Sequence, residues 1–442
     1  MKNKLLRYAF IVSSVGFLFG FDSVVISGVN LPLKNLWESS DWFHGTFIVS
    51  VSLWGTVAGA LLGGYPTESL GRKSTVLWVG VFFTVSAIGS ALVNDPYSFS
   101  FFRFIGGLGA GVGSIAAPAY ISEIAAAQDR GKLGMLFQFN IVFGILMAFL
   151  SNYLLSLYGG ENDWRWMLGI EFVPALFFTA FIPLVPESPR WLIVNQNKQE
   201  DGKRILKMSM SESEANETLD QMNLISGNGN KSSVSLFSGK YHKVLKISFL
   251  MAFFNQFSGI SFVLFYAPEI LEKAGLATTD SLLSSVSVGL VNLVFTLMGI
   301  YLIDRVGRKL LMYIGSVGYI ISLLFIAYGF YFSMPATFKL VFMLMFIASH
   351  AVGQGAVIWV FLSEIFPNEV RSFGQAWGSG LLNVFAAVIA LFGAVLINSY
   401  APWMVFALFA GLMVLQLLFT HFIMPETKGV SLEDLERKLI KY

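Results

Sequence analysis

The sequence predicts an all-α membrane protein with twelve transmembrane helices in two pseudo-symmetric six-helix halves, separated by a central cytoplasmic helical loop. Three observations predict this fold class. Of the 442 residues, 55% are hydrophobic and only 13% are charged, whereas soluble domains carry about 25% charged residues. Twelve apolar stretches are long enough to cross a bilayer, which takes roughly 20 residues of helix. Short polar motifs of the first half also recur in the second half.

The twelve apolar stretches are the predicted spans. They lie approximately at 5–29, 44–65, 74–93, 98–121, 134–157, 166–185, 244–271, 281–303, 310–332, 339–363, 372–398 and 402–424. Membrane β-strands are about 10 residues long and alternate apolar with polar side chains. None of these stretches alternates, so a β-barrel is not predicted. The first stretch lacks a small-residue cleavage site, and we interpret it as a retained transmembrane helix rather than a secretory signal.

The distribution of Lys and Arg predicts the orientation. With the N-terminus inside, most of the 29 basic residues fall in cytoplasmic segments. Five do not: Lys34, Arg165, Lys273 and Lys339 lie in outward loops, and Arg103 lies within a span. Basic residues concentrate on the cytoplasmic side of membrane proteins. Both termini are therefore predicted to be cytoplasmic.

One segment differs from the rest of the chain. Residues 187–243 are polar and rich in Lys, Glu, Ser and Asn. Parts of this segment have amphipathic helical character, and a flexible "SGNGNKSS" stretch follows them. We therefore expect an N-terminal six-helix half over 1–186, a cytoplasmic helical loop over 187–243, and a C-terminal six-helix half with a short tail over 244–442.

Three pairs of motifs make up the repeat, and the two members of each pair are separated by similar numbers of residues. "ESLGRK" at 68–73 returns as "DRVGRK" at 304–309, Glu123 with Arg130 returns as Glu364 with Arg371, and "PESP" at 186 returns as "PETK" at 425. Two parallel halves of this kind are one architecture of secondary transporters, with the substrate site at the midplane between them.

The repeated motifs lie where helices leave the membrane on the predicted cytoplasmic side. Charge-assisted hydrogen bonds among them could hold the cytoplasmic faces together and break when the protein opens inward. The alternative is ordinary positive-inside anchoring, but the pairing of acidic with basic motifs favours gating. The predicted gating residues of this side are Glu68, Arg72, Glu123, Arg130, Glu187, Arg190, Asp304, Arg308, Glu364 and Arg371.

Other function classes are disfavoured by composition. The chain has no cysteine and a net charge of +2, so thiol chemistry is excluded and nucleic-acid binding is not indicated. Its four histidines show no metal-ligand spacing. There is no P-loop and no nucleophile-elbow motif. We expect neither an enzyme nor an ATP-driven pump, and no cofactor or metal.

The motifs together resemble the sugar porter family of the Major Facilitator Superfamily over essentially the whole chain. The matching stretches are "GFDSVVISG", "GGYPTESLGRK", "YISEIAAAQDRGKLG", "PESPRWL", "NQFSGISFVLFYAPEI", "DRVGRK", "SEIFPNEVR" and "PETKG". "PESPRWL" and "PETKG" are specific to sugar porters within that superfamily. The resemblance implies a monosaccharide carrier that works by alternating access.

The resemblance also implies the residues that contact sugar. These are Gln138 in the fifth span, Asn255, Gln256 and Ser261 in the seventh, Asn292 in the eighth and Trp359 in the tenth. It implies further that Phe265 and Tyr266 gate the outer side. Amides both donate and accept hydrogen bonds, which suits sugar hydroxyls, and a Trp face suits the C–H face of a pyranose. The alternative for each amide is a hydrogen bond between helices.

Three positions depart from the family pattern. Asn255 is shorter than the usual Gln, Ser261 is shorter than the usual Asn, and Asn383 stands where a Trp is common. All three reshape the predicted pocket, so hexose and pentose both stay open. His350 lies nine residues before Trp359 and could contact sugar or titrate with Asp22. The alternative is a bond from His350 to a neighbouring helix.

Asp22 lies within the first span. A lone ionised carboxylate at membrane depth costs about 2.5–3.5 kcal/mol on insertion scales, and Arg103 is the one basic residue away from the ends of a predicted span. We predict that the two pair. By resemblance, members that move protons with the sugar carry Asp at this position, and Arg103 would assist. A permanent structural ion pair is the alternative. Glu171 is predicted to reach interfacial water, and no transport role is assigned to it.

A mechanism follows from this pair. Near Arg103 the carboxylate is favoured as an anion, whereas separation of the helices in a dry environment favours its protonated form. We therefore expect a proton-coupled monosaccharide importer, monomeric, in a bacterial cytoplasmic membrane. A proton-independent facilitator and a non-transporting sugar sensor are the alternatives.

Overall fold

The computed structural model describes residues 2–125, 130–208, 211–227, 235–367 and 369–430, with Leu435, Arg437 and Leu439 of the tail. Within these ranges the regular structure is helical and contains no strand. Most of the "SGNGNKSS" stretch and the side chain of Arg130 lie outside the described residues.

The helices of the first part of the chain follow the predicted spans. They are α1 (Lys2–Val25), η1 (Ile26–Gly28), α2 (Asn30–Leu36), α3 (Asp41–Phe43), η2 (His44–Val49), α4 (Val51–Leu62), α5 (Gly64–Ser69), α6 (Arg72–Leu92), α7 (Pro96–Ile124), α8 (Arg130–Tyr158), η3 (Gly160–Asn162), α9 (Asp163–Gly169), α10 (Phe172–Phe181) and η4 (Ile182–Leu184). The polar loop follows as α11 (Pro189–Val194), α12 (Gln199–Leu206), α13 (Glu212–Gly227) and η5 (Gly239–Tyr241).

The remaining helices form the second group of spans. They are α14 (His242–Gln256), α15 (Ile260–Lys273), α16 (Thr278–Val306), α17 (Arg308–Tyr331), α18 (Ala336–His350), η6 (Ala351–Gly355), α19 (Ala356–Ile365), α20 (Arg371–Ser399) and α21 (Pro402–Phe422). Among the described residues, 11 helices are long and apolar enough to cross a membrane, or up to 12 if one pair bent by 41° counts as a single span. The predicted fold class is confirmed.

Contacts divide the chain into two compact units. The first comprises Met1–Ser23, Trp54–Ile145 and Leu168–Ser233, and the second comprises Val24–Leu53, Leu146–Met167 and Val234–Tyr442. The first, second, fifth and sixth spans are therefore each shared between the units. The predicted halves, 1–186 and 244–442, rest on the sequence repeat and stay a prediction.

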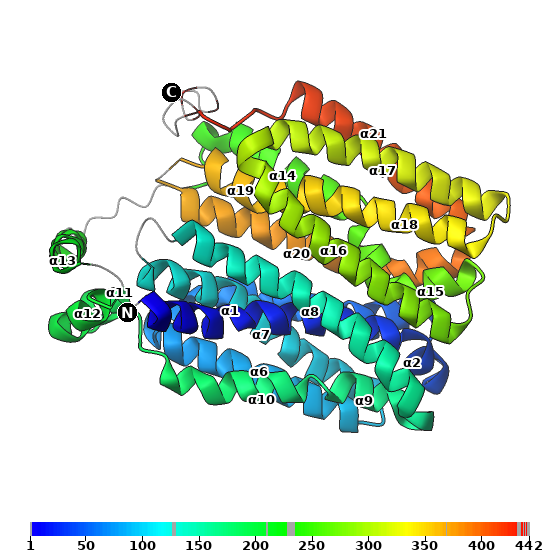
Figure 1. Cartoon of the computed structure of the whole chain (residues 1–442), viewed down its shortest axis with the longest axis horizontal. Helices are drawn as coiled ribbons and strands as arrows, with labels where there is room; N and C mark the ends of the chain where they lie inside the picture. The colour runs from blue at the N-terminus through cyan, green and yellow to red at the C-terminus, as the bar shows by residue number, and fades with distance from the viewer. Residues whose placement is uncertain are drawn as a thin grey trace. The chain divides into compact units, whose positions relative to one another are not determined.

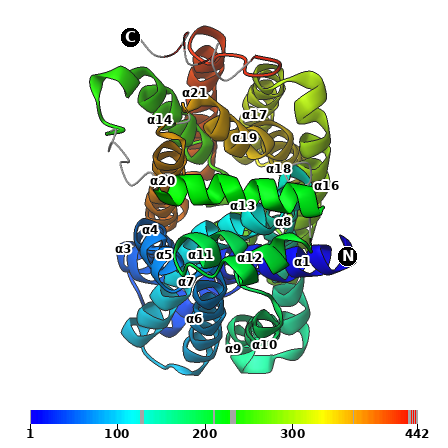
Figure 2. The same cartoon turned by 90° about the vertical axis from the view of Figure 1, so that its left-hand side faces the viewer.

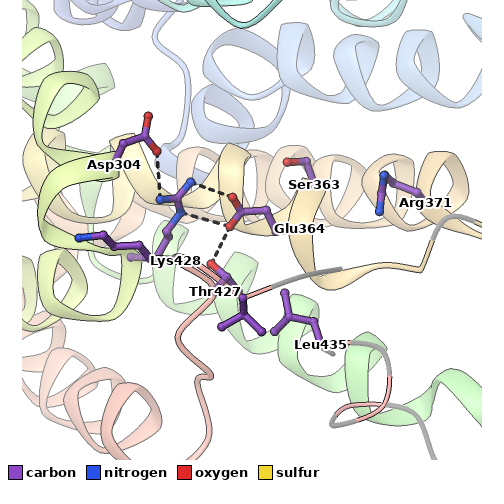
Figure 3. A pocket seen from close by; sticks show the side chains of 10 residues that line it. Asp304, Ser363, Glu364, Arg371, Thr427, Lys428 and Leu435 are labelled. Carbon is purple, nitrogen blue, oxygen red and sulfur yellow. Dashed lines mark hydrogen bonds and ion pairs between the residues drawn. The ribbon is translucent and has the colours of Figure 1, made fainter. Parts of the chain in front are cut away.

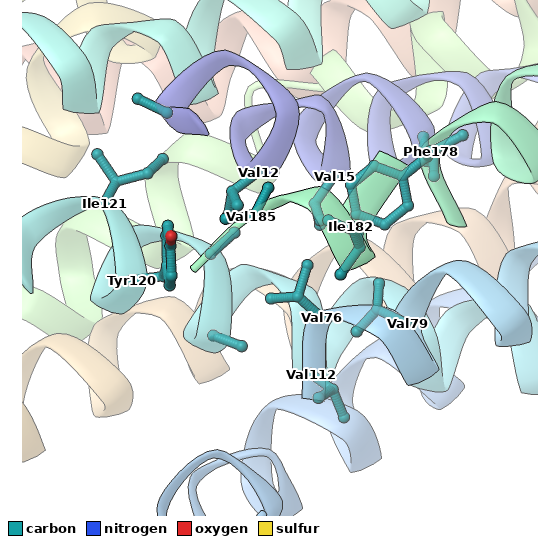
Figure 4. Close-up of a cluster of buried hydrophobic side chains, with 14 of the residues drawn as sticks. Val12, Val15, Val76, Val79, Val112, Tyr120, Ile121, Phe178, Ile182 and Val185 are labelled. Atoms are coloured by element: carbon teal, nitrogen blue, oxygen red, sulfur yellow. The ribbon is translucent and has the colours of Figure 1, made fainter. Parts of the chain in front are cut away.

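The first unit is built on close helix packing around an aliphatic core. Val12 and Val15 of α1 meet Val76 and Val79 of α6, with Phe178 of α10 beside them (Figure 4). Glycines bring α1 against α8, since a Cβ added at Gly20 would lie 2.0 Å from the carbonyl oxygen of Ile141. Small residues at helix contacts are the usual means of close packing in membranes.

The loop helices belong to the same unit. α11, α12 and α13 contact one another (Figure 2). Ile193, Leu206 and Ala215, one from each helix, form a small apolar core of their own. Over its described residues the polar loop therefore forms helices, as its amphipathic pattern predicts.

The second unit contains α14 to α21, and α17, α18 and α21 run alongside one another in it (Figure 1). Two of its spans are interrupted. The seventh breaks between α14 and α15, where Gly259 has φ of 91°, a conformation that suits glycine. The tenth contains the π-helical segment η6 between α18 and α19. Interrupted helices expose backbone and polar groups at membrane depth, which is typical of transporter binding sites.

Candidate functional site

The predicted pair of Asp22 and Arg103 is present in the first unit. Arg103 Nη1 contacts Asp22 Oδ1 in an ion pair, and Arg103 Nη2 donates to the backbone oxygen of Asp22 at 2.8 Å. The side chains are 1% and 2% exposed. Space for the pair comes from Gly106 of α7, where an added Cβ would lie 3.3 Å from Asp22 Oδ1. The geometry agrees with the predicted pairing, and its role in coupling stays a prediction.

Glu171 joins this pair, which the sequence analysis missed. The structure buries Glu171, with 1% exposure, and its carboxyl lies close enough to Asp22 and Arg103 to interact with both. Its Oε1 has no hydrogen-bond partner among the described residues. The expectation that Glu171 reaches interfacial water is wrong, because this residue, at the junction between α9 and α10, is buried. The argument applied to Asp22, that a carboxyl inside an apolar span needs a partner, would have found it.

The three residues make an unbalanced buried cluster. Two carboxyl groups share one guanidinium, so full ionisation would leave an uncompensated negative charge out of contact with water. Such a charge is costly, and a cluster of this kind is neutral when one of the two carboxyls carries a proton. The arrangement can therefore hold a proton in the interior of the first unit.

The second unit gathers uncharged polar side chains at the break in its seventh span. Gln256 Nε2 donates to Asn255 Oδ1 at 2.9 Å, and Ser261 Oγ donates to Gln256 Oε1. Asn255 and Ser261 are 4% and 7% exposed. Three of the predicted sugar contacts thus form one hydrogen-bonded chain. Such a chain can exchange its internal bonds for bonds to hydroxyl groups.

The other predicted sugar residues lie on separate helices. Asn292 is buried on α16, Trp359 is exposed on α19 and Asn383 is half-buried on α20, all in the second unit. Gln138 is half-buried on α8, in the first unit.

His350 is bonded to a neighbouring helix, as the alternative for it predicted. Its Nδ1 lies 2.5 Å from the hydroxyl of Tyr319 on α17. A contact between His350 and sugar stays a prediction.

The predicted outer gate is a kinked aromatic pair. Tyr266 has non-helical backbone angles within α15, and its hydroxyl donates to the backbone oxygen of Ala390 on α20 at 2.8 Å. Asn30 Nδ2 of α2 donates to the backbone oxygen of Phe265 at 2.9 Å. Asp41, next to α2 in the chain, pairs with Lys34 and accepts from Asn398 of α20 at 3.0 Å. The predicted outer ends of α2, α15 and α20 are thereby tied together within the second unit.

The first copy of the repeated motif forms a charged cluster in the first unit. Arg72 bonds Glu68 at 2.8 Å and Glu123 at 2.9 Å, and Ser188 donates to Glu123. Glu187 accepts from the backbone N–H of Lys73 at 3.0 Å. Burial raises the pKa of Glu187 above its ordinary value, against the effect of the backbone N–H groups that it accepts from. Arg190, predicted in the same set, is exposed on α11.

The second copy repeats these contacts in the second unit (Figure 3). Arg308 bonds Asp304 at 3.1 Å and Glu364 at 2.7 Å, and Thr427 donates to Glu364 at 2.6 Å. Glu426 accepts from the backbone N–H groups of Arg308 and Lys309 at 3.1 and 2.9 Å. Burial opposes its ionisation, but these donors and the N–H of Lys428 hold the pKa of Glu426 below its ordinary value.

The predicted gating residue Arg371 lies beside the second charged cluster without an ion pair to it among the described residues. It lies apart from the bonded network in Figure 3, and its Nε donates to the backbone oxygen of Phe366 at 3.2 Å. Arg371 nevertheless lines the same cavity of about 690 Å³ as Asp304, Arg308 and Glu364.

Comparisons with known proteins agree with this architecture. A family model described as sugar (and other) transporter matches residues 8–439. The D-xylose-proton symporter of Escherichia coli K12 is 34% identical over 465 residues, which cover 95% of this chain and 93% of that protein. The arabinose-proton symporter of Bacillus subtilis 168 is 34% identical, with 96% and 93% covered. The inward-open structure of the Escherichia coli xylose transporter matches with a TM-score of 0.87 at 31% identity, over 98% of this chain and 100% of that one.

Proposed function

Because the chain belongs to the sugar (and other) transporter family, we propose that it imports a monosaccharide by alternating access and couples the import to a proton. The resemblance to sugar porters is confirmed by the family match. Relatives are named as transporters and symporters rather than as enzymes, in agreement with the sequence. The proposed substrate class is that of these relatives, whose names include xylose, arabinose, glucose and galactose.

The observation that carries the proton coupling is the buried cluster of Asp22, Arg103 and Glu171. In this site Arg103 neutralises one carboxylate, and the second acid function holds the proton. Movement of α1 against α7 changes how closely Arg103 compensates Asp22, and therefore changes the affinity for the proton. Binding from one side of the membrane and release to the other follow if that movement accompanies alternating access.

The sugar site is assigned to the hydrogen-bonded amides. Asn255, Gln256 and Ser261 at the seventh-span break would bind hydroxyl groups, with Asn292, Asn383 and Gln138 as further amide contacts. Trp359 would pack on the apolar face of the sugar. Shortened side chains at 255 and 261 leave room at one side of the site, so the choice between pentose and hexose is left to measurement.

The gates and the orientation complete the proposal. Phe265 and Tyr266 close the outer side through their bonds to α2 and α20, and the two charged clusters around Arg72 and Arg308 close the inner side. A multi-span transporter with bacterial relatives belongs in a bacterial cell membrane. The distribution of basic residues favours cytoplasmic termini. A monomer is proposed as the working form.

Uptake of labelled xylose, arabinose, glucose, galactose and fructose into proteoliposomes tests the proposal. We expect one or more of these sugars to accumulate above equilibrium only when an inward proton gradient is imposed. Equilibration without accumulation would instead identify a facilitator, in which Asp22 and Arg103 are a permanent structural pair. No entry of any sugar would contradict transport of this substrate class.

A further inference from the structure

The hydroxyl of Tyr319 lies where three spans of the second unit meet. Tyr319, on α17, is 0% exposed. Its hydroxyl is 2.5 Å from His350 Nδ1 at the end of α18, and it donates to Gln354 Oε1 of η6 at 3.3 Å. The side chain of Ser258, between α14 and α15, also lies close enough to this hydroxyl to interact with it. One buried hydroxyl therefore contacts both interrupted spans of this unit.

Ser258 connects this hydroxyl to the predicted sugar residues. Its Oγ donates to the backbone oxygen of Asn255 at 2.7 Å and accepts from the N–H of Ile260 at 3.3 Å. These bonds satisfy backbone groups that the break of the helix leaves free. Ser258 is 0% exposed. If one of its hydrogen-bond partners is removed, water cannot reach its hydroxyl to replace that bond. Ser258 thus links the backbone of Asn255 to the surroundings of the Tyr319 hydroxyl.

The tenth span is tied to the same point through its π-helical segment. Gly353 of η6 packs directly against α17, since an added Cβ would lie 2.8 Å from the Cα of Gly315. Gln354 is 0% exposed, and its Nε2 has no hydrogen-bond partner among the described residues. Its Oε1 accepts the hydrogen bond from Tyr319, which ties this amide to α17. Trp359 follows five residues later on the adjoining helix α19.

We infer that Tyr319 is a positioning residue of the sugar site: its hydroxyl fixes the seventh-span break, with Asn255 and Gln256, relative to the π-helical segment that leads to Trp359. This inference rests on the proposed function. The inference gives Tyr319 no contact with the sugar, because its hydroxyl is bonded to buried protein groups. Its effect is on how well the amides and the Trp face are held for binding, which lowers the cost of ordering them.

Tyr319→Phe is the direct test, with Tyr313→Phe as its matched control. Tyr313 lies on the same helix and also bonds a histidine, with its hydroxyl 2.8 Å from His421 Nδ1, but it is remote from the seventh-span break in sequence and contacts. We expect Tyr319→Phe to raise the Kd for the transported sugar by about fivefold to thirtyfold. The KM of sugar exchange should rise by the same factor, while its maximal rate stays within about twofold of wild type. Tyr313→Phe should leave the Kd unchanged.

A double-mutant cycle with Ser258→Ala separates positioning from general loss of stability. If Tyr319 acts through Ser258, each single variant weakens binding and the double variant binds no more weakly than the poorer single variant. Additive losses would overturn the inference, as would a Kd of Tyr319→Phe equal to that of Tyr313→Phe. Should Tyr319→Phe fail to fold, an unchanged Kd for Ser258→Ala would overturn it alone. If wild type binds none of the five sugars, the proposed function itself fails, and this inference fails with it.

Discussion

The two units differ most at membrane depth. The interior of the first holds charge, with two carboxyls and one guanidinium at Asp22, Glu171 and Arg103. The seventh-span break of the second holds neutral amides and hydroxyls, among them Asn255 and Gln256. A charged cluster changes its state by taking up a proton, whereas a set of amides changes its state by exchanging hydrogen bonds. We therefore propose that the first unit binds the proton and that the second provides most of the sugar contacts.

At the charged clusters formed by the repeated motifs, in contrast, the two units are alike. Each has an arginine held by two acids, a hydroxyl that donates to one of those acids, and a second glutamate that accepts from backbone N–H groups. A glycine of positive φ precedes each arginine, Gly71 with φ of 90° and Gly307 with φ of 103°. Duplication therefore preserved the contacts at these ends, while the membrane interiors diverged in chemistry.

The largest effect is expected from Asp22→Asn, which removes an acid from the first unit without changing its size. Uphill sugar accumulation should be abolished, because the variant cannot exchange a proton at this position. Exchange of labelled sugar between the two sides should persist, since it needs no net proton movement. Both are measured in proteoliposomes with and without a proton gradient.

Asp95→Asn is the control for that experiment. Asp95 is exposed and caps α7 by accepting from the N–H groups of Tyr97 and Ser98 at 3.1 and 2.9 Å, a task that Asn performs equally well. This variant should accumulate sugar as wild type does. Accumulation that survives Asp22→Asn would reduce the buried cluster to a structural role and would remove the contrast between the units.

Glu171→Gln sharpens the same contrast with a smaller effect. The variant keeps the pair of Asp22 and Arg103 but removes the second carboxyl, so the charge of the cluster is balanced without a proton. We expect accumulation at neutral pH to fall, because the cluster no longer needs a proton to balance its charge. If accumulation is unchanged in the same assay, Glu171 does not share the proton.

Gln256→Ala examines the second unit. Loss of this amide should weaken sugar binding by about 1–3 kcal/mol, because Asn255 and Ser261 lose their internal partner and the sugar loses a contact. Equilibrium binding of labelled sugar measures the change. Gln416→Ala is a matched control, since that buried glutamine bonds Ser316 of α17 at 3.0 Å and should affect stability rather than affinity.

Gln138→Ala asks whether sugar binding is confined to the second unit. Gln138 is the one predicted sugar residue in the first unit, and the resemblance implies a loss of about 1–3 kcal/mol here too. A loss of that size would show that the sugar contacts both units. Unchanged affinity would leave sugar binding to the second unit alone.

Sequence reasoning captured what periodicity and motif spacing determine. Spans, repeated motifs and the pairing of Asp22 with Arg103 follow from apolar length and from the rarity of charge within spans. It missed Glu171, because nearness to a span end does not imply exposure, and the residue at the junction of α9 and α10 is buried. It also could not place Tyr319 against Ser258. Such a contact between spans far apart in the sequence depends on the break and the π-helical segment, and neither has a period that a sequence displays.

The smallest expected effect concerns Glu187 and Glu426, the matched glutamates of the two repeated motifs. Their pKa values are shifted in opposite directions. The pKa of Glu187 is raised by burial, so its favourable contribution to stability is present below the ordinary value of 4.5 and is lost as pH rises through the raised value. The pKa of Glu426 is lowered because its backbone donors outweigh burial. Its contribution is present above 4.5 and is lost as pH falls through the lowered value.

Glu187→Gln and Glu426→Gln should therefore show opposite pH dependence in thermal unfolding. Because Gln resembles the protonated carboxyl and does not ionise, the Tm of Glu187→Gln should rise relative to wild type with rising pH, whereas the Tm of Glu426→Gln should fall relative to wild type. Measurement on both sides of pH 4.5 in one detergent allows each variant to serve as the other's control. The same pH dependence in both would mean that the two motifs match in proton affinity as well as in contacts. The units would then differ only in their membrane interiors.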